Sequence, residues 1–378
     1  MNGSNLSQFC DIDAETSQDS VAKIMAWSVI AVFGLLGNAL TIAVVYREKS
    51  LHNTVNYLIV NMAISDLITP LVILPYSIFS MARAKPFSVW VVSGDLGAAL
   101  CKIFFFTADI SPIVSILSLV CITVDRFCAI MFPLRTGSAP LARATKLLVA
   151  ATWIVSAVFL SPYFYGYTLV DLQDRSTCVL KYSDDTAQDK KIRVIFYSIM
   201  CVAFVILPFI VLTFMYTMIL VRLRQQDRSA MALSQSKKER IMRYHKTRRV
   251  VIMALVVLVV FGVCWGPFNM TVFLLVYLWE FNVKKVCYFP TLTFVVQFLG
   301  YANPVFNPVI YFIFIERYRN GLYSIVTCKK RKSKHRTVMN SAGREFSGMA
   351  RSSMGVGASP RTRVTTYSSR ETIQTDKL

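Results

Sequence analysis

Charged residues are scarce in this sequence. Only 16% of its 378 residues are Asp, Glu, Lys or Arg, and it holds three histidines. A soluble domain carries about a quarter charged residues, so long parts of the chain must lack charge. The sequence also has no HExxH or GxSxG motif and no cysteine–histidine spacing typical of zinc sites. We therefore expect neither an enzyme nor a required cofactor.

Long uncharged stretches explain the missing charge. Two stretches, 53–82 and 103–124, hold a single acid each, Asp66 and Asp109, and five more hold none: 24–46, 147–170, 194–221, 250–279 and 286–315. Each is long enough for a helix to cross a hydrocarbon core, which takes roughly 20 residues. The sequence predicts an all-α membrane protein with seven transmembrane helices in residues 22–315, at about 22–46, 54–82, 99–130, 145–167, 194–223, 243–279 and 286–314.

The segments outside these helices have distinct compositions. Residues 1–21 are polar and acidic and show no signal peptide, so we expect a short tail. Apolar residues recur at helical spacing over 316–328, which predicts a short amphipathic eighth helix on the membrane surface. Cys328 at its end is a candidate for palmitoylation. Residues 329–378 are rich in Ser, Thr and Arg, which predicts a disordered tail.

Lys and Arg gather in the loops that follow the first, third, fifth and seventh helices. The positive-inside rule places these loops in the cytoplasm, so the N-terminus lies outside and the C-terminus inside. The net charge of +20 is then a positive inner face beside anionic lipid, and we expect no nucleic-acid binding. Asn2 and Asn5 begin glycosylation sequons in the outer tail, which agrees with this orientation and with the plasma membrane.

Short motifs lie in order on the expected helices. They are Gly37-Asn38, Asn61–Leu67, Cys101, Asp125-Arg126-Phe127, Trp153, Pro208 with Tyr216, Phe261–Pro267 and Asn307–Tyr311. With these motifs the chain resembles the rhodopsin-like G-protein-coupled receptors over about Ala22 to Cys328. The resemblance implies activation of heterotrimeric G proteins by opening of the cytoplasmic end of the bundle. Arrestin and receptor kinases are implied partners of the tail.

The resemblance also implies roles for particular residues. An interior sodium ion, acting as an allosteric ligand, is expected at Asp66, Ser115, Asn303 and Asn307, since a hard cation prefers oxygen ligands. Arg126 resembles the arginine that meets the G protein, and Asp125 would hold it in the inactive state. The remaining switch residues are Trp265 with its packing cluster Ile116, Pro208 and Phe261, the tyrosines Tyr216 and Tyr311, and Pro308 in the seventh helix.

Two details of the resemblance concern regulation and disulfides. Many relatives place an acid at the foot of the sixth helix to pair with Arg126, but this chain has Thr247 there. We therefore hypothesise appreciable basal signalling. The resemblance implies a disulfide between Cys101 and Cys178, and by analogy with several peptide receptors a second one between Cys10 and Cys287.

The ligand class is less sharply indicated. The stretch 286–315 has no lysine, which excludes a retinal Schiff base. Amine receptors of the family carry an Asp where this chain has Ala108, and Asp109 lies about 100° further round the helix. The charged second outer loop favours a peptide, and we hypothesise one with a positively charged end. Pocket candidates are Asp109, Phe105, Tyr76, Phe268 and Tyr277. Alternatives are an amine or lipid ligand, or a transporter or channel.

Overall fold

The computed structural model describes residues 17–83, 89–132, 140–172, 175–230, 237–281 and 288–327. Some predicted features lie outside these residues: the sequons at Asn2 and Asn5, the Cys10–Cys287 pair, Cys328 and the tail from residue 329. They stay predictions.

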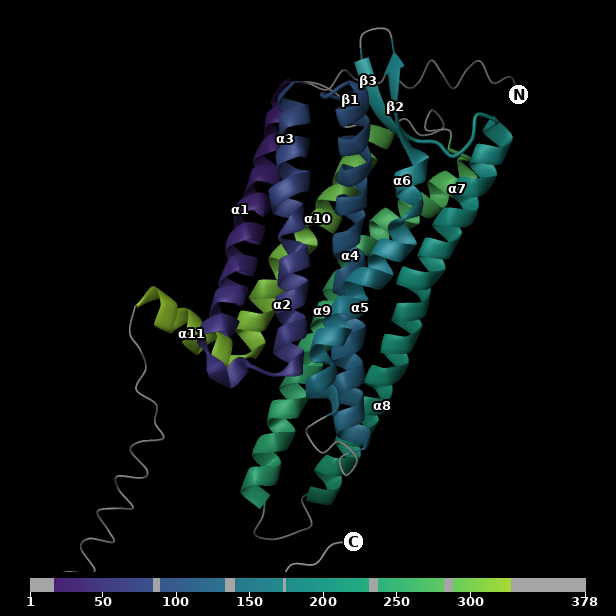
Figure 1. The fold of residues 1–378 in the computed structure, drawn as a ribbon. Helices are drawn as coiled ribbons and strands as arrows, with labels where there is room; N and C mark the ends of the chain where they lie inside the picture. The colour runs from purple at the N-terminus through teal and green to yellow at the C-terminus, as the bar shows by residue number, and fades with distance from the viewer. Residues whose placement is uncertain are drawn as a thin grey trace, which may run out of the picture. The chain divides into compact units, whose positions relative to one another are not determined.

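The described chain is mostly helical (Figure 1). The first half contains α1 (Ser17–Arg47), η1 (Lys49–Leu51), α2 (Thr54–Asp66), η2 (Thr69–Ile73), α3 (Leu74–Ala82), β1 (Val89–Trp90), α4 (Gly94–Met131), α5 (Pro140–Leu160), α6 (Pro162–Gly166), β2 (Tyr167–Leu172) and β3 (Arg175–Leu180). The second half contains α7 (Thr186–Cys201), η3 (Val202–Ile206), α8 (Leu207–Ala230), α9 (Lys237–Phe273), η4 (Leu274–Leu278), α10 (Phe289–Phe314) and α11 (Glu316–Val326).

These elements form the predicted seven-helix bundle. Six segments are long and apolar enough to cross a membrane: Asp19–Arg47, Thr54–Ala82, Gly94–Met131, Ala144–Gly166, Thr186–Gln225 and Arg248–Leu278. The seventh is α10, which meets that criterion together with α11, bent from it by 101°. The prediction of a seven-helix membrane protein is therefore confirmed.

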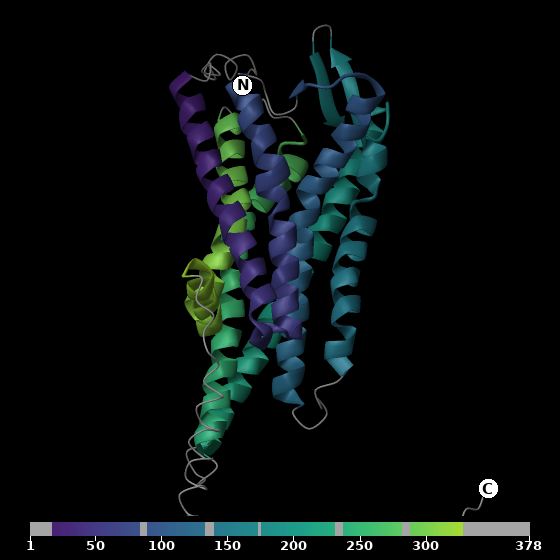
Figure 2. The same ribbon diagram turned by 60° about the vertical axis from the view of Figure 1, so that its left-hand side comes forward.

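The predicted eighth helix is α11, which projects sideways from the bundle (Figures 1 and 2). Tyr318 on one face is fully buried, while Tyr323 and Val326 are exposed. Gly321 lies against α1, where an added Cβ would come within 2.7 Å of Val44. A helix with one packed face and further apolar side chains exposed suits a position at the membrane surface.

Some helices extend beyond the uncharged stretches of sequence. The fifth span begins at Thr186, before the expected start at 194, and passes through a charged first turn. Asp185 caps it, because its Oδ1 accepts a hydrogen bond from the Ala187 amide at 3.0 Å. The start of the uncharged stretch therefore does not mark the start of the helix.

Three spans contain a π-helical turn: η2, η3 and η4. Pro70 lies within η2, and Pro208 is the second residue after η3. A proline offers no N–H to the preceding turn, so that turn can widen from the α to the π pattern.

A small antiparallel sheet with strand order β1-β3-β2 covers the Gly94 end of α4, at the top of Figure 1; the end of the bundle that carries this sheet is called the outer end. β2 and β3 form a hairpin in which Leu169 faces Cys178. Cys178 is bonded to Cys101 of α4, with the two Cα atoms 5.9 Å apart, so the predicted disulfide is confirmed. The sequence indicated only a charged loop here; the disulfide and the strand pairing hold it as a sheet over the bundle.

Candidate functional site

The middle of the bundle holds a buried acid. Asp66 is 1% exposed, and its two carboxylate oxygens accept hydrogen bonds from Ser115 Oγ at 3.0 Å and Asn307 Nδ2 at 2.8 Å. Ser65 lies 3.2 Å from the same Ser115 hydroxyl. Asn303 lies one turn before Asn307, and within the described chain the side-chain oxygens of both have no hydrogen-bond partner. These oxygens together match the donor set that a hard cation such as Na⁺ prefers.

A second buried network joins three helices beside this acid. Asn61 of α2 donates to Ser118 Oγ of α4 at 2.8 Å and to Thr152 Oγ1 of α5 at 3.0 Å. Its Oδ1 accepts from the Trp153 indole at 2.8 Å. One amide therefore uses both of its donor hydrogens and its acceptor, and it fixes α2 against α4 and α5.

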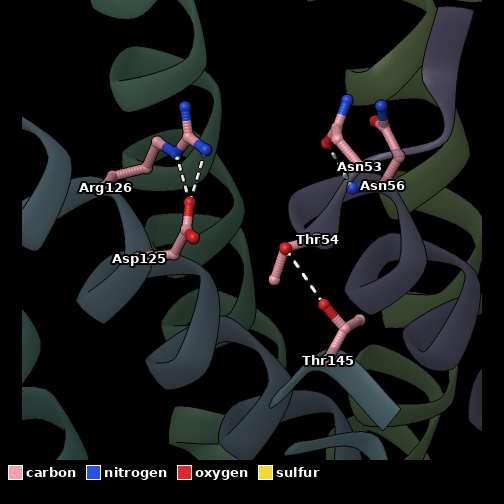
Figure 3. A network of polar contacts seen from close by, with 6 residues as sticks. All are labelled: Asn53, Thr54, Asn56, Asp125, Arg126 and Thr145. Atoms are coloured by element: carbon pink, nitrogen blue, oxygen red, sulfur yellow. Dashed lines mark hydrogen bonds and ion pairs between the residues drawn. The ribbon is translucent and has the colours of Figure 1, made fainter. Parts of the chain in front are cut away.

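The end of α4 near Met131 carries the predicted arginine. Asp125 Oδ2 accepts hydrogen bonds from both Nε and a terminal nitrogen of Arg126, the Nε contact being 2.9 Å (Figure 3). The guanidinium is thus held by its neighbour on the same helix. Figure 3 also shows the Thr54–Thr145 hydroxyl contact, at 3.0 Å, which ties α2 to α5 at this end.

The two predicted switch tyrosines have separate partners. Tyr216 and Thr123 share a hydrogen bond of 2.8 Å between their hydroxyls, which joins α8 to α4. The Tyr311 hydroxyl lies 3.7 Å from Met62 Sδ, which joins α10 to α2. Both side chains are buried. Each tyrosine therefore hydrogen-bonds a different helix, and neither contacts the Asp125–Arg126 pair through a hydrogen bond in the described part of the chain.

A cavity of about 270 Å³ lies in the outer half of the bundle, beneath the sheet. α4, α6, β2, α7, η3, α9, η4 and α10 all contribute to its wall. Of the predicted pocket residues, Phe105, Asp109, Phe268 and Tyr277 line it, and Tyr76 does not. Tyr76 instead packs against Trp90 and Phe104, with ring centroids 5.1 and 4.6 Å away.

Other lining residues escaped the sequence analysis. They include four tyrosines and two amides: Tyr163, Tyr167, Tyr197, Tyr301, Asn269 and Gln297. Nothing in the one-dimensional pattern separates them from aromatic residues that face lipid. Tyr163 and Tyr167 reach the cavity from α6 and β2, which follow the break at Ser161, and the others reach it from α7, α9 and α10.

The floor of the cavity is the predicted packing cluster. Trp265, Ile116 and Phe261 all line it, while Pro208 does not. The Trp265 ring lies edge-on to Phe268 and Tyr301, at centroid distances of 5.7 and 6.0 Å. A molecule in the cavity would therefore contact the side chain proposed to switch.

Gly300 lets α10 approach α9 closely at the floor of the cavity. A Cβ built at Gly300 of α10 would lie 3.1 Å from the Trp265 ring, tighter than most real contacts. The indole fills the space that a larger residue would occupy. Its orientation is therefore sensitive to shifts of α10 against α9.

The outer rim beside the cavity is tied by ionic contacts. Lys190 of α7 pairs with Glu280 after η4 at 3.1 Å, and the Arg193 guanidinium lies 4.2 Å from the Phe281 ring centroid. The backbones of Glu280 and Phe281 have positive φ angles of 50° and 62°, which residues other than glycine rarely adopt. These contacts hold the outer ends of the fifth and sixth spans together.

Arg193 also connects this rim to the second outer loop. Its guanidinium pairs with Asp189 at 2.7 Å, and the other oxygen of Asp189 accepts from the Tyr182 amide at 2.7 Å. Burial, aided by Asp189, raises the pKa of the Tyr182 phenol to about 12, so this side chain stays neutral at physiological pH.

Comparison with known proteins places this arrangement in a family. The family described as 7 transmembrane receptor (rhodopsin family) matches residues 37–311. The chain belongs to this receptor family. It is 29% identical to galanin receptor type 1 of Homo sapiens, over 84% of this chain and 85% of that receptor.

Two further relatives are also receptors. Galanin receptor 2b of Danio rerio is 26% identical over 82% of this chain and 76% of its own length. The endothelin-1 receptor of Sus scrofa is 24% identical over 79% of this chain and 70% of its own length. The receptor family is one of multi-pass membrane proteins and not of enzymes, and membership of it favours the receptor over the transporter and channel alternatives.

Proposed function

We propose that this receptor binds an extracellular peptide and activates heterotrimeric G proteins. The observation that carries the proposal is the cavity that ends on Trp265, Ile116 and Phe261. A ligand there would touch the residues whose packing separates two arrangements of the sixth span. A ligand shifts such an equilibrium only by binding one arrangement better than the other, and direct contact supplies that difference.

A peptide fits the outer end better than the alternatives. The relatives named above include galanin receptors, and their names are those of peptide receptors. The rim adds charged and polar groups over a wide area, from the sheet to the Lys190–Glu280 pair. Asp109 and several tyrosines line the cavity, and an uncharged lipid would leave the Asp109 carboxylate without a charged partner.

The inner end supports the coupling role. Arg126 is held by Asp125, and opening of the sixth span would let the guanidinium reach a partner instead. We place the N-terminus outside at the plasma membrane, and the C-terminus with its receptor-kinase and arrestin contacts in the cytoplasm. This follows the Lys and Arg distribution of the loops.

Na⁺ is the proposed allosteric ligand at Asp66. Ser115, Asn303 and Asn307 supply further oxygens around that carboxylate. A bound cation would compensate the buried negative charge and stabilise the closed packing of α2, α4 and α10.

The test is a neuropeptide library applied to cells that express the full-length receptor. Calcium and cyclic-AMP responses are read together, with an amine and a lipid collection in parallel. Arg126→Ala is the matched control, since it leaves the outer cavity intact and should abolish the response without abolishing peptide binding. Responses to amines or lipids alone would overturn the peptide proposal. Peptide binding without any G-protein response in the unmodified receptor would overturn the coupling proposal.

A further inference from the structure

The outer cavity has one charged side chain in its wall. Among the described residues that line it, Asp109 is the acid, and no Lys, Arg or His is present. The nearby cations of the rim are already paired, Lys190 with Glu280 and Arg193 with Asp189. The carboxylate therefore has no compensating positive charge from the protein inside the cavity.

The carboxylate of Asp109 is only partly satisfied. Its Oδ2 accepts a hydrogen bond from the Tyr163 hydroxyl at 2.6 Å. In the described part of the chain this side chain makes that one hydrogen bond, so Oδ1 stays available to a ligand. A carboxylate removed from water gains most from a cationic partner, because desolvation penalises an unpaired charge.

Four tyrosines share the cavity wall with Asp109. Tyr163, Tyr167, Tyr197 and Tyr301 all line the cavity and lie near enough to interact electrostatically with Asp109. Aromatic faces attract cations through the negative charge of their π systems, and the attraction grows when water is excluded.

Ring contacts fix two of these phenols in place. Tyr163 lies edge-on to Tyr167 at 5.0 Å. Tyr167 is stacked on Phe105 with ring centroids 4.3 Å apart and planes 3° from parallel. A set of rings held in this way offers fixed faces to a ligand and loses little freedom when one binds.

We propose that this cavity is a cation subsite, in which an ammonium or guanidinium group of the ligand pairs with Asp109 among the four tyrosines. The proposal deepens the proposed function and rests on the cavity being the ligand site of the receptor. The ligand group that enters deepest is then a positive charge, at one end or on a side chain of a peptide. An acidic lipid or acidic peptide end would be repelled.

Cys201 allows a test that needs no known ligand. This free, half-buried cysteine lines the same cavity. Methanethiosulfonate reagents convert a thiolate to a mixed disulfide and release methanesulfinate. The probes are a trimethylammonium-ethyl reagent and a sulfonato-ethyl reagent, of opposite charge. The full-length receptor is labelled in membranes, and modification of Cys201 is followed by mass spectrometry with Cys201→Ser as the blank.

The measured quantity is the ratio of the two labelling rates, each divided by the reagent's rate with 2-mercaptoethanol. We expect the cationic reagent to be favoured in the unmodified receptor, and Asp109→Asn to lower the ratio about tenfold, because one charge acts with opposite sign on the two probes. Asp95→Asn is the matched control: the residue lies exposed in the first turn of the same helix, and its change should leave the ratio unaltered.

A second measurement needs no Asp109 variant. Labelling of the unmodified receptor by neutral methyl methanethiosulfonate should be slowed by phenyltrimethylammonium and not by benzenesulfonate. In a third arm, Gln297→Cys with Cys201→Ser moves the thiol to α10, where the same Asp109-dependent ratio is expected.

A ratio equal to that of free thiol and unchanged by Asp109→Asn would overturn the cation subsite, as would equal protection by the two competitors. These labelling and protection measurements do not depend on signalling, so the proposed function is tested separately. If peptides activate the receptor but labelling shows no charge selectivity, the cation subsite is refuted and the proposed function stands. If labelling is charge-selective but only non-peptide cations activate the receptor, the peptide proposal is refuted and the subsite stands.

Discussion

Asn61 makes the sharpest stability prediction, because both of its amide hydrogens and its oxygen form hydrogen bonds to other helices. The side chain is 3% exposed and bonds to Ser118, Thr152 and the Trp153 indole. Ser118 and Thr152 also donate their own hydroxyl hydrogens to backbone carbonyls, at 2.7 Å each. Asn61→Ala would therefore leave these two hydroxyls with a partner but leave the indole N–H without one.

The expected loss follows from that difference. The two interactions with hydroxyl acceptors are worth about 0.6 kcal/mol each, the average for interhelical hydrogen bonds in membranes. The indole N–H left unpaired costs about 1–3 kcal/mol. Asn61→Ala should thus destabilise the receptor by about 2–4 kcal/mol, which lowers the apparent unfolding midpoint by about 4–10 °C for a chain of this size.

A double-mutant cycle isolates the indole contribution. Asn61→Ala, Trp153→Phe and the double variant are heated in detergent, and the folded fraction is measured by size-exclusion chromatography at a fixed heating time. Removing the indole N–H first should make Asn61→Ala less damaging, with a coupling energy of about 1–2 kcal/mol. Thr152→Val is the control that removes a hydroxyl acceptor without touching the indole.

Two results would refute this reasoning. One is an Asn61→Ala midpoint equal to that of Thr152→Val. The other is strict additivity of Asn61→Ala and Trp153→Phe, which would mean that the indole bond to Asn61 contributes nothing beyond its neighbours.

Three further predictions concern signalling and the outer rim. Thr247→Glu places an acid at the foot of the sixth helix and should lower ligand-free GTPγS binding severalfold. Equal ligand-free GTPγS binding in membranes with the unmodified receptor and in mock-transfected membranes would contradict basal activity. Replacing N-methylglucamine chloride with NaCl should lower ligand-free GTPγS binding, and Asp66→Asn should remove that sodium dependence. An equal sodium response of the unmodified receptor and of Asp66→Asn would exclude the site. Arg193→Ala should speed proteolysis after η4 and lower the unfolding midpoint by about 2–5 °C, because a partly buried ion pair and a cation–π contact are lost. Arg193→Lys, the control, retains part of each contact. An unchanged cleavage rate would show that the rim contacts do not order that segment.

The number of helices, the eighth helix and the interior acids could be predicted from the sequence alone. Lipid excludes unpaired charge and unpaired backbone groups, so a membrane span must appear as a long uncharged run, and an acid within it must face the interior. Asp66 and Asp109 were recognised by this rule, and both face the interior of the bundle. The Cys101–Cys178 bridge required the resemblance to a family as well, because spacing does not select a partner.

The wall of the cavity was decided only by tertiary structure. Tyr76 and Tyr163 look alike in the sequence, as aromatic residues near the outer end of a span. Tyr76 turns to Trp90 and Phe104, while the break before α6 carries Tyr163 to Asp109. Aromatic side chains gain burial against protein or lipid alike, so their composition does not reveal which face they occupy. Turns, breaks and cross-helix packing choose that face, and with it the group that a ligand would meet.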